Sequence, residues 1–359
     1  MVMISKQFWN GKRVLITGCT GFKGSWLTLW LHGLGAKIYG YSLTPPTDPS
    51  MWDDMQVEKL CENVCYADIR DYVTLKQFIV EIQPEIVIHM AAQPLVRYSY
   101  AYPRETYEVN VMGTVNLLDA IRETGNTVKS VVNVTTDKCY ENKEWIWAYR
   151  ENEPIGGHDP YSNSKGCSEL VTSSFVNSYF NQAGTTAVGS GRAGNVIGGG
   201  DWADDRLIPD IIRSFSQSQE VFIRYPNAVR PWQHVLEPLS GYLLLAEKLY
   251  TDGQKYSGGW NFGPLDSDTK TVEQIVQQMC SIWGNGASWV KDNNDHPHEA
   301  NLLRLDCSKA RMLLGWNPVW NSEITLNKLT VWYKAYFENK NMLELSQQQI
   351  EEYMEDMGC

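Results

Sequence analysis

Residues 14–24 read VLITGCTGFKG and decide the fold. The first four are short and apolar, which is typical of a buried strand, and the apolar residues 25–34 that follow have the length of a helix. Between them, Gly18, Gly21 and Gly24 have the G-x-x-G-x-x-G spacing of a dinucleotide turn. In such a turn the glycines permit a sharp bend, close approach of the backbone to a diphosphate and tight helix–strand packing. The stretch predicts a strand–turn–helix unit that opens a nucleotide-binding fold.

Strand and helix patterns alternate up to about residue 180. Further strands are expected at residues 37–43, 64–69, 86–93 and 131–136. This alternation predicts an α/β fold with a doubly wound (Rossmann) parallel sheet. We expect residues 1–188 to form the nucleotide-binding domain with the catalytic residues, and residues 189–359 to form mainly a smaller substrate-binding lobe, with the chain crossing between the two. Residues 110–123 are expected to form a helix, and the Gln- and Glu-rich tail, residues 344–356, an exposed one.

The composition bounds the class of protein. The chain has 359 residues, of which 43% are hydrophobic and 20% charged, as in a globular protein with an ample core. Its formal net charge of −11 disfavours general binding to nucleic acid or to anionic membranes. No apolar run approaches the roughly 18 residues of a membrane span, and charged and polar residues interrupt the N-terminus where a signal peptide would be apolar. We therefore expect a soluble, cytoplasmic protein.

Cysteine and histidine spacing gives no metal site. Eight cysteines in a chain of this length do not indicate a disulfide framework. The one close pair, Cys61 and Cys65, lacks a neighbouring histidine and is interpreted as structural. His296 and His298 lie in a polar stretch without a third ligand nearby, so a surface or substrate-contact role is favoured. No metal is expected.

A second informative stretch opens with VVNVTT, the pattern of a buried parallel strand. It places Thr136, Asp137 and Lys138 where that strand ends. Tyr161 and Lys165 follow four residues apart, so on a helix they share one face. Because open α/β sheets bind ligands at the carboxyl ends of their strands, these five side chains indicate a dehydrogenase-like catalytic centre. For the Asp–Lys neighbours the alternative is an exposed ion pair in a strand-end loop.

The residues leave the choice of dinucleotide open. The second strand should end with an acid that binds the adenosine ribose of NAD, but Ser42 stands there, and no arginine follows to accept a 2′-phosphate. Asp68 ends the third strand and either meets adenine or caps the helix that follows. His89 lies in an apolar run and is interpreted as a buried core histidine rather than a catalyst.

Over nearly its whole length the chain resembles the extended short-chain dehydrogenase/reductase family. The resemblance rests on the glycine turn, then Asn110, Thr136 and the pair Tyr161-x-x-x-Lys165, in that order. It implies NAD as cofactor. The implied cofactor-binding residues are Gly18, Thr20, Gly21, Phe22, Lys23, Gly24, Ser42, Asp68, Ile69, Ala91, Ala92, Gln93, Asn110, Tyr161 and Lys165.

Longer matches narrow the resemblance within that family. Residues 17–27, 41–47 and 192–202 are similar to sugar-nucleotide 4,6-dehydratases. Lys138 stands where dTDP-linked dehydratases carry glutamate, which favours the CDP-linked branch or its UDP-linked relatives. Cys19 departs from the histidine of that branch at a position bordering the cofactor phosphates, and so bears on cofactor affinity.

The resemblance implies a dehydration in three stages. Tyr161, with a pKa lowered by Lys165 and the nicotinamide charge, takes the proton of the sugar 4-hydroxyl while the C4 hydride goes to NAD. Lys138, when neutral, then removes the C5 proton, and protonated Asp137 donates to the departing 6-hydroxyl. Thr136 hydrogen-bonds the sugar near O4. Hydride returns to C6 and leaves a 4-keto-6-deoxy sugar.

The implied substrate is a nucleotide sugar, CDP-D-glucose, on a route to the deoxy sugars of surface polysaccharide. Substrate contacts are expected at Gln93, Asn195, Arg206, Leu207, Arg230 and His298. Of these, Arg206 and Arg230 suit the diphosphate, because arginine forks match phosphate oxygens. A homodimer through two helices per subunit is also implied. Its apolar side chains are Val115, Leu117, Leu118, Leu170, Val171 and Phe175.

Other readings remain open at this point. Within enzymes they are a 4-epimerase or a UDP-N-acetylhexosamine dehydratase, and an epimerase has no use for the acid Asp137 and the base Lys138. From a different class, a non-catalytic dinucleotide sensor can share the fold, since fold alone does not give function. Such a sensor has no need of both Tyr161 and Lys165, which disfavours it.

Overall fold

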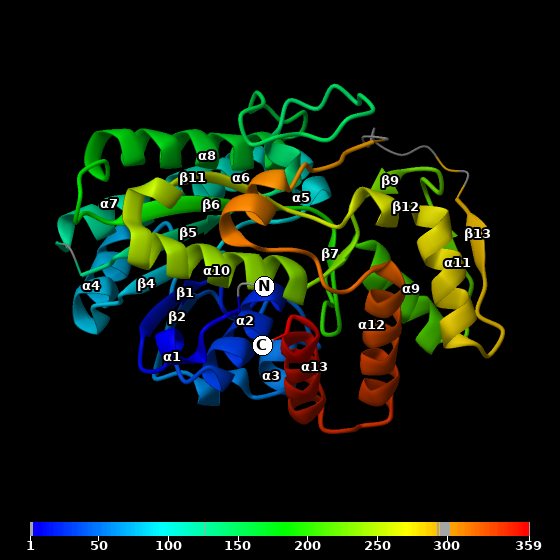
Figure 1. Ribbon diagram of the computed structural model, residues 1–359. Helices are drawn as coiled ribbons and strands as arrows, with labels where there is room; N and C mark the ends of the chain where they lie inside the picture. Colours follow the sequence, from blue (N-terminus) through cyan, green and yellow to red (C-terminus); the bar gives the residue numbers. More distant parts are fainter. Residues whose placement is uncertain (1–2, 126, 293, 295–301, 359) are drawn as a thin grey trace.

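The computed structural model describes residues 3–125, 127–292, 294 and 302–358. Its main sheet has the strands β1 (Arg13–Thr17), β2 (Lys37–Ser42), β3 (Asn63–Tyr66), β4 (Ile86–His89), β5 (Ser130–Val134), β6 (Ala187–Ala193) and β11 (Gly258–Phe262). They pair in parallel in the order β11-β6-β5-β4-β1-β2-β3 (Figure 1). The predicted doubly wound sheet is confirmed, and its order reverses beside β1, where such sheets bind ligands.

Helices cover both faces of this sheet (Figure 1). On β1, Val14 and Ile16 pack into one buried cluster and Leu15 into another, because side chains alternate along a strand. The first face carries α2 (Phe22–Gly33) and α10 (Leu236–Asp252). The second carries α4 (Tyr72–Ile82), α7 (Gly113–Glu123) and α8 (Pro160–Tyr179). Because both faces are covered, the central strands β1, β4 and β5 are mostly apolar and almost wholly buried.

The helical run that contains Asn110 begins earlier than the sequence indicated. It opens with α6 (Pro103–Tyr107), whose first-turn proline is suited to a helix start, and passes through the π-helical turn η2 (Glu108–Met112) into α7. Another short helix, α5 (Val96–Ala101), precedes it. Asn110 therefore lies in a π-helical turn, a feature often found at functional sites.

The smaller lobe is built from short sheets and helices. Its strand pairs are β7 (Val196–Ile197) with β10 (Gln233–His234), β9 (Val229–Arg230) with β12 (Lys270–Thr271), and β8 (Val221–Ile223) with β13 (Trp289–Lys291). Its helices are α9 (Leu207–Ser216), α11 (Val272–Trp283) and α12 (Ser322–Phe337). The boundary expected at residue 188 falls inside β6, and β11 and α10 return to the main sheet from the later half of the chain.

The remaining elements are α1 (Lys6–Trp9), α3 (Met51–Asp54), η1 (Val57–Leu60), η3 (Asp137–Cys139), η4 (Gly253–Tyr256), η5 (Asp266–Asp268), η6 (Ala310–Leu314) and α13 (Met342–Asp356).

Helix α10 anchors both ends of the described chain. Glu247 on α10 accepts hydrogen bonds from Trp9 Nε1 (2.6 Å) and from the N–H of Ser5. Glu237 accepts one from Tyr353 Oη (2.7 Å) on α13.

The expectation of an exposed tail helix is therefore wrong for one face of α13. Tyr353 and Ile350 are buried there, because this face packs on α2 and α12.

Among the described residues, no helix has both the length and the apolar character needed to cross a membrane.

Candidate active site

The glycine turn forms a cradle between β1 and α2. Gly18 has φ +74°, and a Cβ added there would lie 2.7 Å from the N atom of Ala91, which follows β4 together with Ala92. A Cβ on Gly24 would lie 2.3 Å from the Gly18 carbonyl oxygen, so helix and strand pack too closely for any side chain. Gly21 is the N-cap of α2 and no side chain caps that end. Uncapped N–H groups at a helix N-terminus suit an anion, so the cradle fits the diphosphate of a dinucleotide.

Ser42 at the end of β2 lies beside this cradle. Thr20 Oγ1 donates to the Leu43 carbonyl (2.9 Å) and lies 2.7 Å from Ser42 Oγ. Because Thr20 has a single proton, Ser42 donates to it and keeps its lone pairs for a ribose hydroxyl. Cys19 was expected to border the cofactor phosphates. Cys19 lies within the glycine turn with its side chain fully buried beside Gly40, and its effect on cofactor affinity stays a prediction.

Asp68 does not cap the helix after β3. Asp71 is the N-cap of α4, because it directly precedes the first helical residue. Asp68 forms an ion pair with Arg70 at 2.6 Å, and the hydrogen bonds of that guanidinium hold its pKa below the ordinary value. Ile69 packs against Gly113 of α7, where an added Cβ would lie 2.7 Å away. The adenine-side role of Asp68 and Ile69 stays a prediction.

Asn110 ties the end of β4 to α8. Its Oδ1 accepts from the N–H of Gln93 (2.8 Å), while its Nδ2 donates to the Gln93 carbonyl (3.0 Å) and to Ser164 Oγ (2.9 Å). The Gln93 side chain is also used inside the loop, since Nε2 donates to Thr106 Oγ1 (2.8 Å) and Oε1 accepts from the N–H of Leu95. Gln93 therefore orders the loop that borders the cradle.

The segment that follows β5 (residues 135–140, the predicted catalytic segment) brings Asp137 into a buried position. Thr136 caps the short helix η3, accepting from the N–H of Lys138, and its Oγ1 donates to Asp137 Oδ1 (3.0 Å). Asp137 is 2% exposed, and burial raises the pKa of its carboxyl against the positive charges of Lys138 and Arg230. The alternative of an exposed Asp–Lys ion pair is thus wrong for Asp137. A carboxyl group with a raised pKa is better suited to donate a proton than an ordinary one.

Tyr161 and Lys165 lie on one face of α8, as the four-residue spacing predicted. Lys165 is 6% exposed, and its Nζ donates to the Val134 carbonyl (3.1 Å). Burial lowers its pKa to about 8. Burial raises the pKa of Tyr161 to about 12, opposed by the Thr136 hydroxyl and the charge of Arg206.

The lowering of the Tyr161 pKa expected from Lys165 together with the nicotinamide charge stays a prediction, because among the protein's own groups burial raises it. The cost of desolvating a phenolate outweighs the positive charges around it. Lys165 is instead directed to the end of β5.

Three basic side chains and two acids, Asp137 and Asp201, converge on the same region. Phe22 and Lys23 open α2, and burial, together with the nearby charges of Arg206 and Lys165, lowers the pKa of Lys23 to about 7. Asp137 acts in the opposite direction on the same lysine. The first turn of α2 thus faces the catalytic segment, and the cluster gives this edge of the sheet a positive field suited to phosphate.

The remaining predicted substrate residues come from the smaller lobe. Arg206 precedes α9, pairs with Asp201 at 3.0 Å and lies near Tyr161; Leu207 is the first residue of α9. Arg230 is 9% exposed, with its charge near Asp137. Asn195 has φ +41° and follows β6. The structure thus brings Arg206 and Arg230 to the catalytic groups, while His298 lies outside the described residues.

His89 is a buried core histidine, as interpreted from the sequence. It is 3% exposed, its Nδ1 lies 2.7 Å from Thr17 Oγ1, and burial lowers its pKa to about 3. It is neutral and braces β1 against β4.

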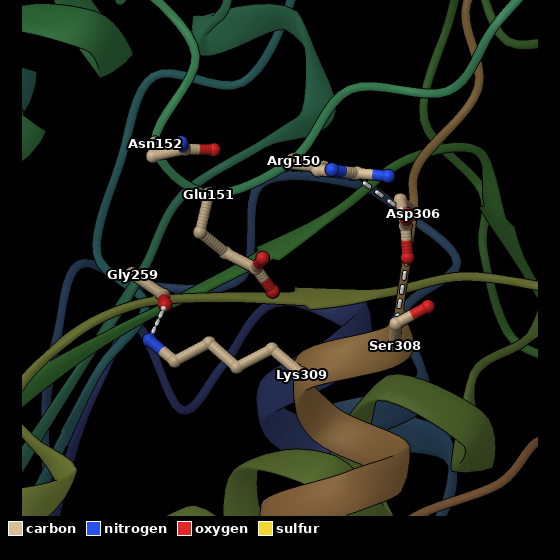
Figure 2. Close-up of a pocket in the computed structure, with 7 residues that line it drawn as sticks. All are labelled: Arg150, Glu151, Asn152, Gly259, Asp306, Ser308 and Lys309. Carbon is tan, nitrogen blue, oxygen red and sulfur yellow. Dashed lines mark hydrogen bonds and ion pairs between the residues drawn. The ribbon is translucent and has the colours of Figure 1, made fainter.

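A separate cavity of about 510 Å³ lies beside the edge strand β11 (Figure 2). Figure 2 shows the carboxylate of Glu151 and the ammonium group of Lys309 extending into it, and Lys309 Nζ donates to the Gly259 carbonyl (2.7 Å). None of the residues predicted to be catalytic lines it. The candidate active site is the strand edge at β1, β4 and β5, not this cavity.

Sequence reasoning missed three residues at the site. Gly194 lies against Asp137, and Glu169 and Arg192 form a buried ion pair behind the catalytic segment. The spacing of Glu169 was a usable signal, since it lies one further helical turn beyond Lys165. Nothing local to Arg192 or Gly194 indicated their partners.

The fold and site define an α/β enzyme of the short-chain dehydrogenase type, with a dinucleotide cradle and a Tyr-x-x-x-Lys pair beside an Asp–Lys pair. Residues 15–329 match the family described as GDP-mannose 4,6 dehydratase. The chain belongs to this family.

Known proteins agree with this placement. A CDP-glucose 4,6-dehydratase of Salmonella typhimurium is 58% identical over 356 residues, covering 98% of this chain and 99% of that protein. The dTDP-glucose 4,6-dehydratase of Streptomyces venezuelae, solved with NAD bound, has a TM-score of 0.76 at 23% identity, covering 92% of this chain and 99% of that one. A UDP-glucose 4-epimerase of Thermotoga maritima reaches a TM-score of 0.78 at 22% identity, covering 90% and 99%. The two structures show the same fold.

Proposed function

We propose that this protein is a hydro-lyase that converts CDP-D-glucose to CDP-4-keto-6-deoxy-D-glucose. The observation that carries the proposal is the placement of Asp137 and Lys138 at the end of β5, beside Tyr161. The 58% identity to a CDP-glucose 4,6-dehydratase along almost the full length supports cytosine as the nucleobase of the substrate. The fold alone does not separate dehydratases from epimerases, since both kinds of solved structure match it.

Each catalytic residue has a role that its surroundings support. Tyr161 takes the proton of the 4-hydroxyl, helped by the nearby positive charge of Arg206 and the hydroxyl of Thr136. Asp137, whose pKa burial raises, donates to the departing 6-hydroxyl. Lys138 removes the proton from C5, which the 4-ketone has acidified.

We infer that NAD is the resident cofactor, held by the glycine cradle and by the neutral acceptor Ser42. When bound, NAD accepts a hydride from the sugar and returns one to it within the same turnover. Because Ser42 offers a hydroxyl rather than a carboxylate, its bond to the ribose is weaker than a charge-assisted one by roughly 1 kcal/mol. The purified protein should therefore arrive partly empty, be stimulated by NAD and discriminate only moderately against NADP. Titration calorimetry with both dinucleotides tests this.

We also propose a cytoplasmic homodimer formed through α7 and α8. Leu117 and Leu118, expected at the interface, are instead buried in the core against the sheet. Leu170 on α8 is 59% exposed, and Val171 and Phe175 are partly exposed, which leaves an apolar strip for the second subunit.

The function is tested with a panel of nucleotide sugars. CDP-, UDP-, dTDP- and GDP-linked hexoses are each incubated with the enzyme and NAD, and the alkaline ultraviolet absorbance of 4-keto-6-deoxy sugars is recorded. We expect product from CDP-D-glucose at a rate well above the others. Turnover of another member of the panel in preference would replace the proposed substrate, and a C4-epimerised product would replace the reaction.

A further inference from the structure

A buried ion pair reaches both ends of the catalytic segment, which we define as residues 135–140. Glu169 lies on α8 and Arg192 on β6, and the pair they form touches Thr135 at the start of the segment and Tyr140 at its end. The proposed acid and base lie between these two anchors.

The pair itself has a fixed geometry. Arg192 Nε and Nη2 donate to the two carboxylate oxygens of Glu169, both at 2.9 Å, and the side chains are 6% and 5% exposed. A fork-to-fork contact of this kind restrains orientation as well as distance. A Cβ on Gly259 of β11 would lie 2.5 Å from Arg192 Nη2, so a glycine makes room for the guanidinium. Burial alone would lower the pKa of Arg192, but Glu169 raises it well above its ordinary value.

Both partners also bond to the segment, and Arg192 Nη1 donates in addition to the Glu151 carbonyl outside it (3.1 Å). Glu169 Oε1 accepts from Thr135 Oγ1 (2.5 Å), and Arg192 Nη1 donates to Tyr140 Oη (2.8 Å). Tyr140 Oη in turn donates to Asn261 Oδ1 (2.7 Å) on β11. The segment is thus tied to α8, β6 and β11 at once.

The two halves of the catalytic machinery depend on this pair to different degrees. Tyr161 and Lys165 lie on α8 and are placed by the helix itself, which is capped by Asp159 and tied to Asn110. Asp137 and Lys138 lie outside regular strands, so their positions depend on how the segment is held.

We propose that Glu169 and Arg192 are positioning residues for the elimination step, holding the acid Asp137 and the base Lys138 against the sugar that Tyr161 oxidises. This rests on the proposed function. Loss of the contact at either end of the segment slows elimination more than oxidation at C4, because Tyr161 is held by α8 and meets the segment through the Thr136 hydroxyl, whereas Asp137 and Lys138 belong to the segment itself.

Replacing either member of the pair leaves a buried charge and can unfold the protein, so the test uses neutral, nearly isosteric changes at the ends of the segment. Thr135→Val removes only the bond to Glu169, whose oxygens keep both arginine bonds. Tyr140→Phe removes the bond from Arg192 and also the bond that Tyr140 donates to Asn261. The matched control is Thr172→Val on α8, which removes a buried hydroxyl that bonds to Asn133, away from the segment.

The readout is a single turnover of CDP-D-glucose with enzyme and NAD in excess. Rising absorbance of the reduced nicotinamide follows oxidation, and its decay follows elimination and hydride return. We expect Thr135→Val and Tyr140→Phe to slow the decay about tenfold with the rise changed less than about twofold, since displacements of ~1 Å can cost as much as 10²-fold. Thr172→Val should change neither phase.

Two results would overturn the inference: both phases slowed by one common factor, or a decay in Thr135→Val and Tyr140→Phe no slower than in Thr172→Val. The proposed function is judged separately, from turnover of CDP-D-glucose by the unchanged protein. The ratio of the decay rate to the rise rate in the variants tests only the proposed positioning role of Glu169 and Arg192.

Discussion

The carboxyl group of Asp137 lies directly against Gly194, so closely that a Cβ built on that glycine would stand 1.9 Å from Asp137 Oδ2. The two residues lie at the ends of neighbouring strands, β5 and β6, and are 57 positions apart in the chain. Gln233 Nε2 donates to the Gly194 carbonyl (3.1 Å) and to that of Phe262 (2.9 Å), which fixes the glycine in turn. The position of the proposed acid is therefore set by the packing of these two strand ends.

Gly194→Ala should slow product formation about tenfold or more, because the added methyl group must displace the acid from its place at C6. NAD binding should persist, since the cradle lies on other strands. The control is Gly33→Ala in α2, where an added Cβ meets nothing within 4 Å. Rates are compared after thermal unfolding has verified that both variants are folded. An unchanged rate in Gly194→Ala would show that the acid is not held there.

Asp137→Asn and Lys138→Met should each lower turnover by about 10² to 10⁴-fold, the usual contribution of a general acid or base. Both variants should still bind NAD. Lys129→Met is the control for charge removal, because Lys129 is exposed and precedes the opposite end of β5. Turnover near that of the unchanged protein in both catalytic variants would refute the assignment.

Glu247 should make the fold less stable as the pH rises. Burial raises the pKa of its carboxyl from 4.5 to about 7 in the folded chain. Between these values the folded state keeps a proton that the unfolded state has lost, so stability is highest at low pH and falls as the pH rises through this window. Glu247→Gln keeps an acceptor for Trp9 but cannot titrate. Its melting temperature should therefore fall less between pH 5 and 8 than that of the unchanged protein; equal slopes would contradict this.

Leu170→Glu should convert a homodimer to a monomer. The side chain is 59% exposed on α8, and a charge there cannot be buried against a second copy without a partner. Sedimentation of the unchanged protein should give twice the chain mass of 40.9 kDa, and of the variant, one chain. Val331→Glu on α12, 53% exposed away from α7 and α8, should remain dimeric. A monomeric unchanged protein would exclude the dimer.

Local pattern was enough to predict the sheet and half of the site. The glycine turn can be recognised from the spacing of its three glycines alone. The placement of Tyr161 and Lys165 on one face follows from the pitch of a single helix. The tail helix was misjudged because its polar composition hid a buried face at Ile350 and Tyr353.

The remaining half of the site depends on contacts between distant segments. The seat of Asp137 on Gly194 and the fork of Glu169 with Arg192 arise from the pairing of β5 with β6 and the packing of α8, which no local pattern encodes. The burial of Tyr161 also depends on the whole fold, and among the protein's own groups it outweighs the positive charges that would lower the pKa of the phenol.

The central claim is that one turnover moves a hydride from C4 of the sugar to C6. CDP-D-glucose deuterated at C4 tests it most directly, with the product analysed by mass spectrometry and NMR. The account predicts a 4-keto-6-deoxy sugar that retains the deuterium, now on C6. A product without deuterium at C6, or one that keeps its 6-hydroxyl and is inverted at C4, would contradict it.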